Sequence, residues 1–164
     1  AIQAALTGHQ VFSSLHTSNA SGALPRLLDL GAEPFLLASS LNCVIGQRIL
    51  RRVCLHCKES FVPPEIMAKD IRDVLGKLLT REVTLFKGKG CSECGDSGFL
   101  GRIGIFEVLP ISDKIAKLVL SRADADTVER LAIEEGMISM KQDGYLKAIE
   151  GITTIEEVLR VAQD

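Results

Sequence analysis

Two cysteine pairs constrain this chain more than any other feature of its sequence. Cys54 and Cys57 form one Cys-x2-Cys motif, and Cys91 and Cys94 form a second one after 33 intervening residues. Two residues between the cysteines allow one tight turn to present both sulfurs to a metal ion, and four thiolates match the tetrahedral coordination that Zn2+ prefers. The spacing therefore predicts a structural zinc site with these four residues as ligands.

Other chemistry remains open to the same cysteines. A redox dithiol or a disulfide would use the thiols without a metal. His56 lies inside the first pair and offers an alternative ligand. The remaining cysteine, Cys43, lies in an apolar run and is expected to be a small buried core residue. The odd number of cysteines argues against a disulfide framework.

The composition is that of a folded protein that does not bind nucleic acid. The chain has 164 residues, of which 46% are hydrophobic and 24% charged, enough for one domain or two small ones. Its formal charge of −2 provides no basic field for nucleic acid, and one Tyr and no Trp provide few stacking groups. Reduced thiols, no signal sequence and no apolar run near the ~20 residues that cross a bilayer predict a cytoplasmic location.

The first 53 residues are expected to alternate between strands and helices, as in an α/β layer. We expect a short strand over Val11–Leu15, a helix over residues 20–31 that stops at Gly31, a helix over residues 34–43, and a strand over Ile45–Val53. Arg48 lies in this last strand. It is open to a salt-bridged structural role or to contact with nucleotide or a neighbouring subunit.

The rest of the chain divides into a cysteine-rich and a helical segment. Residues 54–110 predict a helix from Pro63 to about Leu79 and a strand over Arg102–Val108, with closely spaced glycines that suit a metal-anchored turn. Residues 111–164 carry apolar stripes at helical spacing, expected to pack on each other. Capping-box patterns mark helix starts at about residues 139 and 153. The expected domains are therefore residues 1–53, 54–110 and 111–164.

Five stretches carry a resemblance to a known family, and they are residues 6–20, 26–40, 47–54, 101–107 and 150–159. The first reads LTGHQVFSSLHTSNA and resembles the histidine box of the secretion and traffic ATPases, the motors that drive type II secretion and type IV pilus assembly. The resemblance covers essentially the whole chain. It implies the C-terminal part of a RecA-like ATPase core, a small zinc-binding subdomain and a helical C-terminal extension.

The resemblance also implies roles for single residues. His16 corresponds to the histidine that faces the γ-phosphate of the nucleotide, a task suited to imidazole, which hydrogen-bonds phosphate. His9 belongs to the same box with a weaker, structural role. Read without the family, His16 would be a turn or capping residue. Ser14, Ser18 and Asn19 depart conservatively from the family pattern, which affects the hydrogen bonding around His16.

The resemblance extends to cofactors and partners. It implies ATP and Mg2+ in a parent protein that forms a homo-hexamer in the cytoplasm, held at the inner membrane by a platform protein. The printed residues contain no Gly-x-x-x-x-Gly-Lys-Ser/Thr loop and no Walker B segment. We therefore expect an excised fragment, inactive alone. The main rival interpretation is an autonomous zinc-ribbon-like module that binds protein or nucleic acid.

Overall fold

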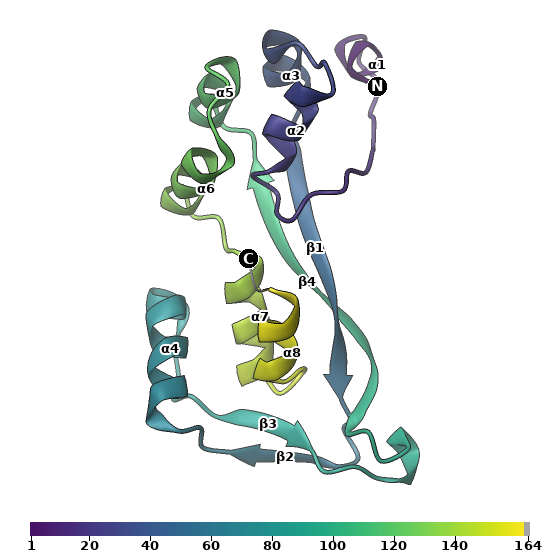
Figure 1. The fold of residues 1–164 in the computed structure, drawn as a ribbon, viewed down its shortest axis with the longest axis vertical. Helices are drawn as coiled ribbons and strands as arrows, with labels where there is room; N and C mark the ends of the chain where they lie inside the picture. The colour runs from purple at the N-terminus through teal and green to yellow at the C-terminus, as the bar shows by residue number, and fades with distance from the viewer. Residues whose placement is uncertain (163–164) are drawn as a thin grey trace. The chain divides into compact units, whose positions relative to one another are not determined.

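The computed structural model describes residues 1–162 and confirms a mixed α/β class (Figure 1). Short 3-10 turns cover Gly76–Leu78 (η1) and Ser92–Cys94 (η2). The helices and strands are α1 (Ile2–Leu6), α2 (Ala23–Asp29), α3 (Pro34–Ser40), β1 (Cys43–Val53), β2 (Lys58–Phe61), α4 (Glu65–Leu75), β3 (Leu85–Gly88), β4 (Phe99–Pro110), α5 (Asp113–Leu120), α6 (Ala125–Glu134), α7 (Met140–Ile149) and α8 (Ile155–Val161).

The chain forms two compact units. The first unit contains Ala1–Gly46 and Glu107–Ile138, and the second contains residues 47–106 together with the residues from 139 on. Strands β1 and β4 pair with each other in opposite directions, and each contributes residues to both units (Figure 1). This division into compact units does not establish which segments fold independently, so the three expected domains stay a prediction.

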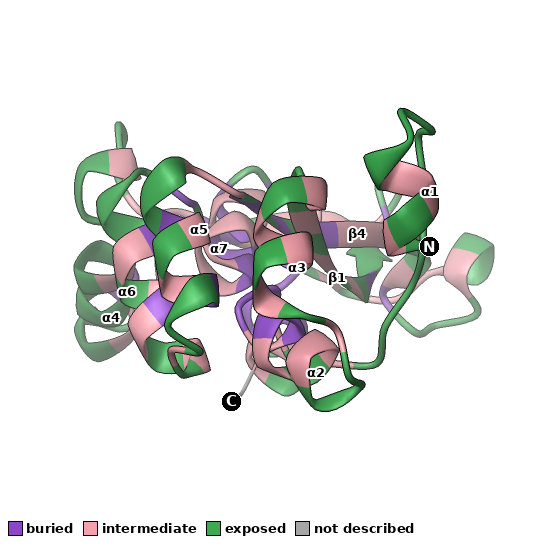
Figure 2. Ribbon diagram, turned by 90° about the horizontal axis from the view of Figure 1, so that it is seen from above, coloured by how far each residue is buried: buried purple, intermediate pink, exposed green. Residues whose placement is uncertain are grey.

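The first unit is built on helices with one apolar face each. Helix α2 ends where predicted, because Gly31 adopts φ +88° and the N–H of Ala32 returns to the carbonyl of Leu27. Helices α5 and α6 each carry buried residues on one face and exposed residues elsewhere (Figure 2). These helices pack on each other as expected. The buried apolar core of this unit is Ala20, Leu24, Leu37, Leu109, Ile115, Val119, Val128, Ala132 and Met137.

The second unit surrounds helix α7. The predicted capping box is present at its start, since the Ser139 hydroxyl accepts the N–H of Gln142 and the Gln142 side chain accepts the N–H of Ser139. Helix α7 contacts α4, α8 and β3. The fully buried Tyr145 donates a hydrogen bond of 2.7 Å to Asp70 on α4, so the polar end of this aromatic core residue is satisfied.

Three local expectations are wrong. Residues 11–15 form no strand, because no strand among residues 1–162 pairs with them and an isolated strand leaves its backbone groups without ladder partners. Cys43 is exposed rather than buried, because it begins strand β1 and lies on the outward side of its alternation. The cap of helix α8 is Thr154, one residue later than the predicted Thr153.

Candidate metal centre

The two cysteine pairs lie in turns that adjoin paired strands. Cys54 and Cys57 lie between β1 and β2, and Cys91 and Cys94 lie between β3 and β4. Strands β2 and β3 are antiparallel, with Lys58 opposite Gly88, so the residues directly outside that pair are brought together. Backbone hydrogen bonds fix the approach from both sides: Lys89 donates to the Cys57 carbonyl at 3.1 Å, and Cys54 donates to the Gly98 carbonyl at 2.9 Å.

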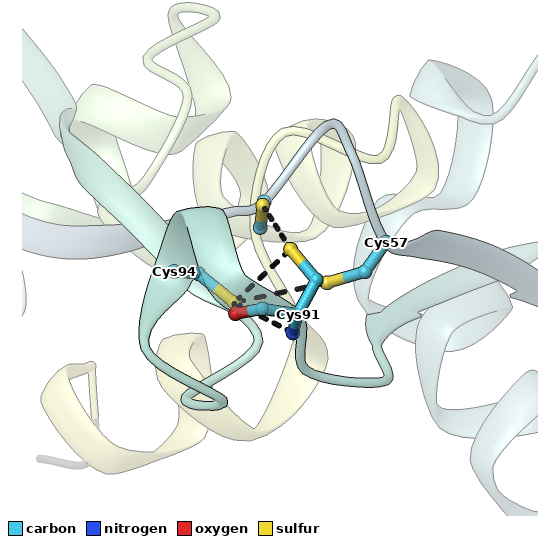
Figure 3. A group of neighbouring side chains, drawn as sticks. Cys57, Cys91 and Cys94 are labelled. Atoms are coloured by element: carbon cyan, nitrogen blue, oxygen red, sulfur yellow. Dashed lines mark hydrogen bonds between the residues drawn. The ribbon is translucent and has the colours of Figure 1, made fainter.

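The four sulfurs form a compact cluster. Neighbouring Sγ atoms are 3.8 Å apart for Cys54 and Cys91, 3.9 Å for Cys57 and Cys94, and 3.7 Å for Cys91 and Cys94 (Figure 3). A tetrahedral Zn2+ site with bonds of about 2.3 Å has sulfur–sulfur edges of about 3.8 Å. All four Sγ atoms lie within 4.8 Å of one another. The four cysteines are therefore positioned to bind one metal ion.

Backbone N–H groups support the sulfur of Cys94. It accepts hydrogen bonds from the N–H groups of Cys91 and Gly98, each at 3.3 Å. Burial opposes ionisation of this thiol, but these donors outweigh it and lower the pKa of Cys94 to about 6. At Cys57 burial dominates and raises the pKa to about 12. The cluster therefore holds protons that a bound metal ion displaces, which is the usual behaviour of thiolate sites.

The site is closed in character. Cys54 is fully buried and the other three cysteines are half-buried. Four sulfur ligands on one tetrahedral Zn2+ ion would leave no open coordination position for a water molecule. His56 is exposed, and among the described residues it does not belong to the cluster of possible ligands. Such a site stabilises structure and does not activate a substrate.

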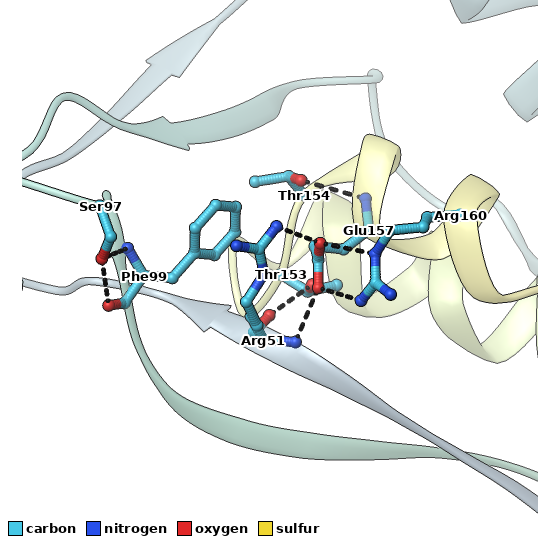
Figure 4. Close-up of polar contacts among 7 residues, drawn as sticks. All are labelled: Arg51, Ser97, Phe99, Thr153, Thr154, Glu157 and Arg160. Carbon is cyan, nitrogen blue, oxygen red and sulfur yellow. Dashed lines mark hydrogen bonds and ion pairs between the residues drawn. The ribbon is translucent and has the colours of Figure 1, made fainter.

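A buried carboxylate links helix α8 to the strand that leads into the first cysteine pair (Figure 4). The Glu157 carboxylate accepts three hydrogen bonds: from the guanidinium of Arg51 at 2.6 Å, from the backbone N–H of Arg51 at 3.0 Å, and from the guanidinium of Arg160 at 2.9 Å. The Thr153 hydroxyl donates to the Arg51 carbonyl at 2.8 Å, and the Arg51 guanidinium lies 4.1 Å from the ring centre of Phe99. Arg51 is three residues before Cys54, so this network anchors one side of the metal centre.

The role of Glu157 was missed by sequence reasoning. The capping box expected near residue 153 corresponds to Thr153-x-x-Glu156 in the sequence, whereas in the structure the Thr154 hydroxyl accepts the N–H of Glu157. Thr153 and Glu157 are thereby released for contacts with Arg51. The Thr154-x-x-Glu157 register was present in the sequence, but local spacing did not distinguish it from the register one residue earlier.

Replacing Glu157 with Gln is expected to flatten the acid dependence of stability. The hydrogen bond from Arg51 leads the groups that lower the pKa of Glu157 to about 2, whereas in the unfolded chain a Glu titrates near about 4.3. Its contribution, about 3 kcal/mol at most, is complete above the unfolded pKa and is lost as the pH falls toward about 2. Denaturant unfolding across this pH range measures the effect. The matched control is Glu156→Gln, at the exposed neighbouring position, and an equal acid dependence in both variants would contradict the assignment.

Both histidines of the histidine box lie in the first unit and are exposed. His16 is exposed and lies outside any helix or strand, and His9 is exposed with its Nδ1 atom 3.1 Å from the Thr7 hydroxyl. Arg48 is half-buried on β1. The structure brings together the four predicted metal ligands, whereas the roles of His16, His9 and Arg48 stay predictions.

Within residues 1–162, no helix combines the length and the apolar character needed to span a lipid bilayer.

Comparison with known proteins gives whole-chain matches. The family model described as type II/IV secretion system protein matches residues 1–160. The chain is 41% identical to the type IV pilus assembly ATPase PilB of Thermus thermophilus over 97% of this chain and 18% of that protein. It is 42% identical to type II secretion system protein E of Pseudomonas aeruginosa and 40% identical to type II secretion system ATPase E of Vibrio cholerae, in each case over 100% of this chain and 32% of the relative.

Proposed function

Because the chain belongs to the type II/IV secretion system protein family, whose ATPases have the RecA-like fold, we propose that it is the C-terminal portion of a hexameric motor ATPase. In this proposal the parent protein is cytoplasmic, binds ATP and Mg2+, and powers type II secretion or type IV pilus assembly. It acts on an inner-membrane platform protein and reaches the membrane through that partner. The 164-residue chain alone is proposed to be inactive in ATP hydrolysis.

The observation that carries this proposal is similarity over the full length of the chain. Relatives named as ATPases of both machines align with 97% to 100% of its residues at about 40% identity. The chain spans about a fifth to a third of the length of these relatives, so the activity and partners of a whole motor are proposed for the parent protein. The rival zinc-ribbon module receives no support from the near-neutral charge.

The proposed role of the metal centre is mechanical. A Zn2+ ion held by Cys54, Cys57, Cys91 and Cys94 would crosslink the turn after β1 to the turn before β4. Both strands continue into the unit that contains the histidine box. A crosslink at this end of the β1–β4 pair would make the pair more rigid. A conformational change driven by nucleotide binding or hydrolysis would then displace the platform protein instead of deforming the strands.

The proposed role of His16 is to sense the nucleotide phosphate. Its side chain is exposed, which leaves the imidazole accessible to a ligand, and an imidazole N–H donates to phosphate oxygens. ATP supplies the phosphoryl group whose cleavage drives the motor, and Mg2+ neutralises its charge. In this proposal the contact between His16 and the γ-phosphate couples the nucleotide state to the conformation of the first unit.

Replacing His16 with Ala in the full-length protein is expected to lower the kcat of ATP hydrolysis by about 100-fold, the usual cost of losing one hydrogen-bond donor to a reacting oxyanion. A steady-state ATPase assay of the purified oligomer measures the effect. His56→Ala is the matched control, because His56 is also exposed and is not among the metal ligands. An unchanged kcat in the His16 variant would remove this residue from the nucleotide site, and absence of ATPase activity in the full-length protein would refute the motor assignment.

A further inference from the structure

A short segment that follows His16 is held by two carboxylates from elsewhere in the first unit. We call residues 16–20 the histidine turn. The backbone N–H of Ala20 donates to Oε1 of Glu107 at 2.5 Å. The side-chain amide of Asn19 donates to Oε2 of Glu129 on α6 at 3.3 Å. The end of the turn is thereby tied to β4 and to α6.

Local hydrogen bonds also order the turn, one inside it and one with Gly22 just after it. The Thr17 hydroxyl donates to the Asn19 carbonyl at 3.0 Å, and the Asn19 side-chain oxygen accepts the N–H of Gly22 at 2.9 Å. Three residues separate His16 from Ala20, and the first of them already takes part in these bonds. A displacement at Ala20 is therefore expected to move the backbone that bears His16.

The Glu107 carboxylate is buried, and its position is set from a second side. Glu107 is only 4% exposed, and Ala20, whose N–H it accepts, is 1% exposed. A buried carboxylate needs hydrogen-bond donors, and the Ala20 N–H is one that it accepts. On β1, a Cβ atom added at Gly46 would lie 2.8 Å from both Cγ and Oε1 of Glu107. The missing side chain at Gly46 gives the carboxylate the space from which it reaches Ala20.

We propose that Glu107 is a positioning residue for His16, because it fixes Ala20 and thereby the direction in which the histidine turn presents the imidazole. Glu107 itself is buried and does not contact nucleotide in this proposal. The inference rests on the proposed function in one respect, which is that His16 binds the nucleotide phosphate. The hold of Glu107 on the turn is a property of the chain alone.

Amide hydrogen exchange and 15N relaxation of the 164-residue chain test the hold directly. In Glu107→Ala, exchange at the Ala20 amide accelerates roughly 10- to 100-fold, as expected for the loss of a hydrogen bond to a charged group. Backbone order at His16 falls with it. In Glu107→Gln a side-chain oxygen remains to accept the bond, so the acceleration is smaller. In Gly46→Ala the carboxylate is chemically intact but displaced, and the Ala20 amide again exchanges faster.

The matched control is Glu134→Gln, at an exposed position of helix α6 in the same unit. It leaves exchange at Ala20 and order at His16 unchanged. Amides of α6 provide the reference for global stability, so a general loss of structure is separated from local release of the turn. If Glu107→Ala does not fold, Glu107→Gln and Gly46→Ala answer the same question. Unchanged protection of Ala20 in both, relative to α6, overturns the proposal.

The full-length ATPase separates this inference from the proposed function. Gly46→Ala, which displaces the carboxylate, is expected to lower kcat on the order of 10- to 100-fold with KM near the wild-type value, because misplacement of a group affects the reacting geometry more than substrate binding. If His16→Ala leaves kcat unchanged while Ala20 is released in the exchange experiment, the nucleotide role of His16 is wrong and the structural hold is supported. If His16→Ala is inactive but Gly46→Ala keeps both full kcat and full Ala20 protection, the positioning role is wrong.

Discussion

Replacing Cys91 with Ser is expected to abolish stoichiometric metal binding and to lower the melting temperature of the chain by roughly 10 °C. An ion held by the four cysteines would bind only the folded state, and would stabilise that state by about 4 kcal/mol when free zinc exceeds the dissociation constant a thousandfold. For a chain of this size each kcal/mol shifts the melting temperature by about 2–4 °C. Elemental analysis and thermal unfolding measure the two effects, and a strong chelator added to the wild-type chain should reproduce the melting shift.

The loss of stability should be concentrated around the four sulfurs. The antiparallel pair of β2 and β3 and the turns that contain the cysteines should lose amide protection first, because these segments are joined to the cluster by the Lys89–Cys57 and Cys54–Gly98 hydrogen bonds. The matched control is Cys43→Ser, since Cys43 is an exposed free cysteine outside the cluster. A metal-free wild-type chain with chelator-insensitive melting and readily oxidised thiols would instead favour the redox interpretation.

The candidate metal ligands were predictable from the sequence because the spacing of the cysteines within each pair is typical of metal-binding turns. Cys-x2-Cys turns impose their geometry over four residues, so Cys54 with Cys57 and Cys91 with Cys94 could be assigned without knowledge of the fold. The Ser139 capping box was predictable for the same reason. Each cysteine pair and the capping box depend on contacts between near neighbours in the chain, whereas the meeting of the two pairs depends on the pairing of β2 with β3.

The features that sequence reasoning missed depend on partners far away in the chain. Strand β2 was not predicted, because its four residues Lys58–Phe61 carry little signal until they pair with Leu85–Gly88. Residues 11–15 have strand propensity but form no strand, because no strand of the described chain pairs with them. Glu107 and Glu157 read as ordinary surface carboxylates until the fold buries them against Ala20 and Arg51.

Replacing Gly88 with Ala is expected to disrupt the metal centre although Gly88 contributes no ligand. The backbones of Gly88 and Gly98 approach so closely that a Cβ atom added at Gly88 would lie 2.1 Å from the Gly98 carbonyl oxygen and 2.6 Å from its Cα atom. Both contacts are with backbone, which no rotamer change relieves, so the cost should reach the upper end of overpacking, about 3 kcal/mol. The same shift would strain the hydrogen bond from Gly98 N–H to Cys94 Sγ. Loss of such support typically lowers metal affinity by about 10- to 100-fold.

Competition with a chromophoric chelator measures the affinity, and denaturant unfolding measures the stability. Gly95→Asn is the matched control, in the turn that contains Cys91 and Cys94. Gly95 has φ +57° and nothing within 4 Å of an added Cβ atom, and Asn tolerates this left-handed conformation. If the Gly88 and Gly95 variants bind metal equally well, close backbone approach is not what shapes the site. If only the Gly88 variant loses affinity, the metal centre depends on the contact of two glycines as well as on its four cysteines, because that contact closes the loop that presents Cys91 and Cys94 to the ion.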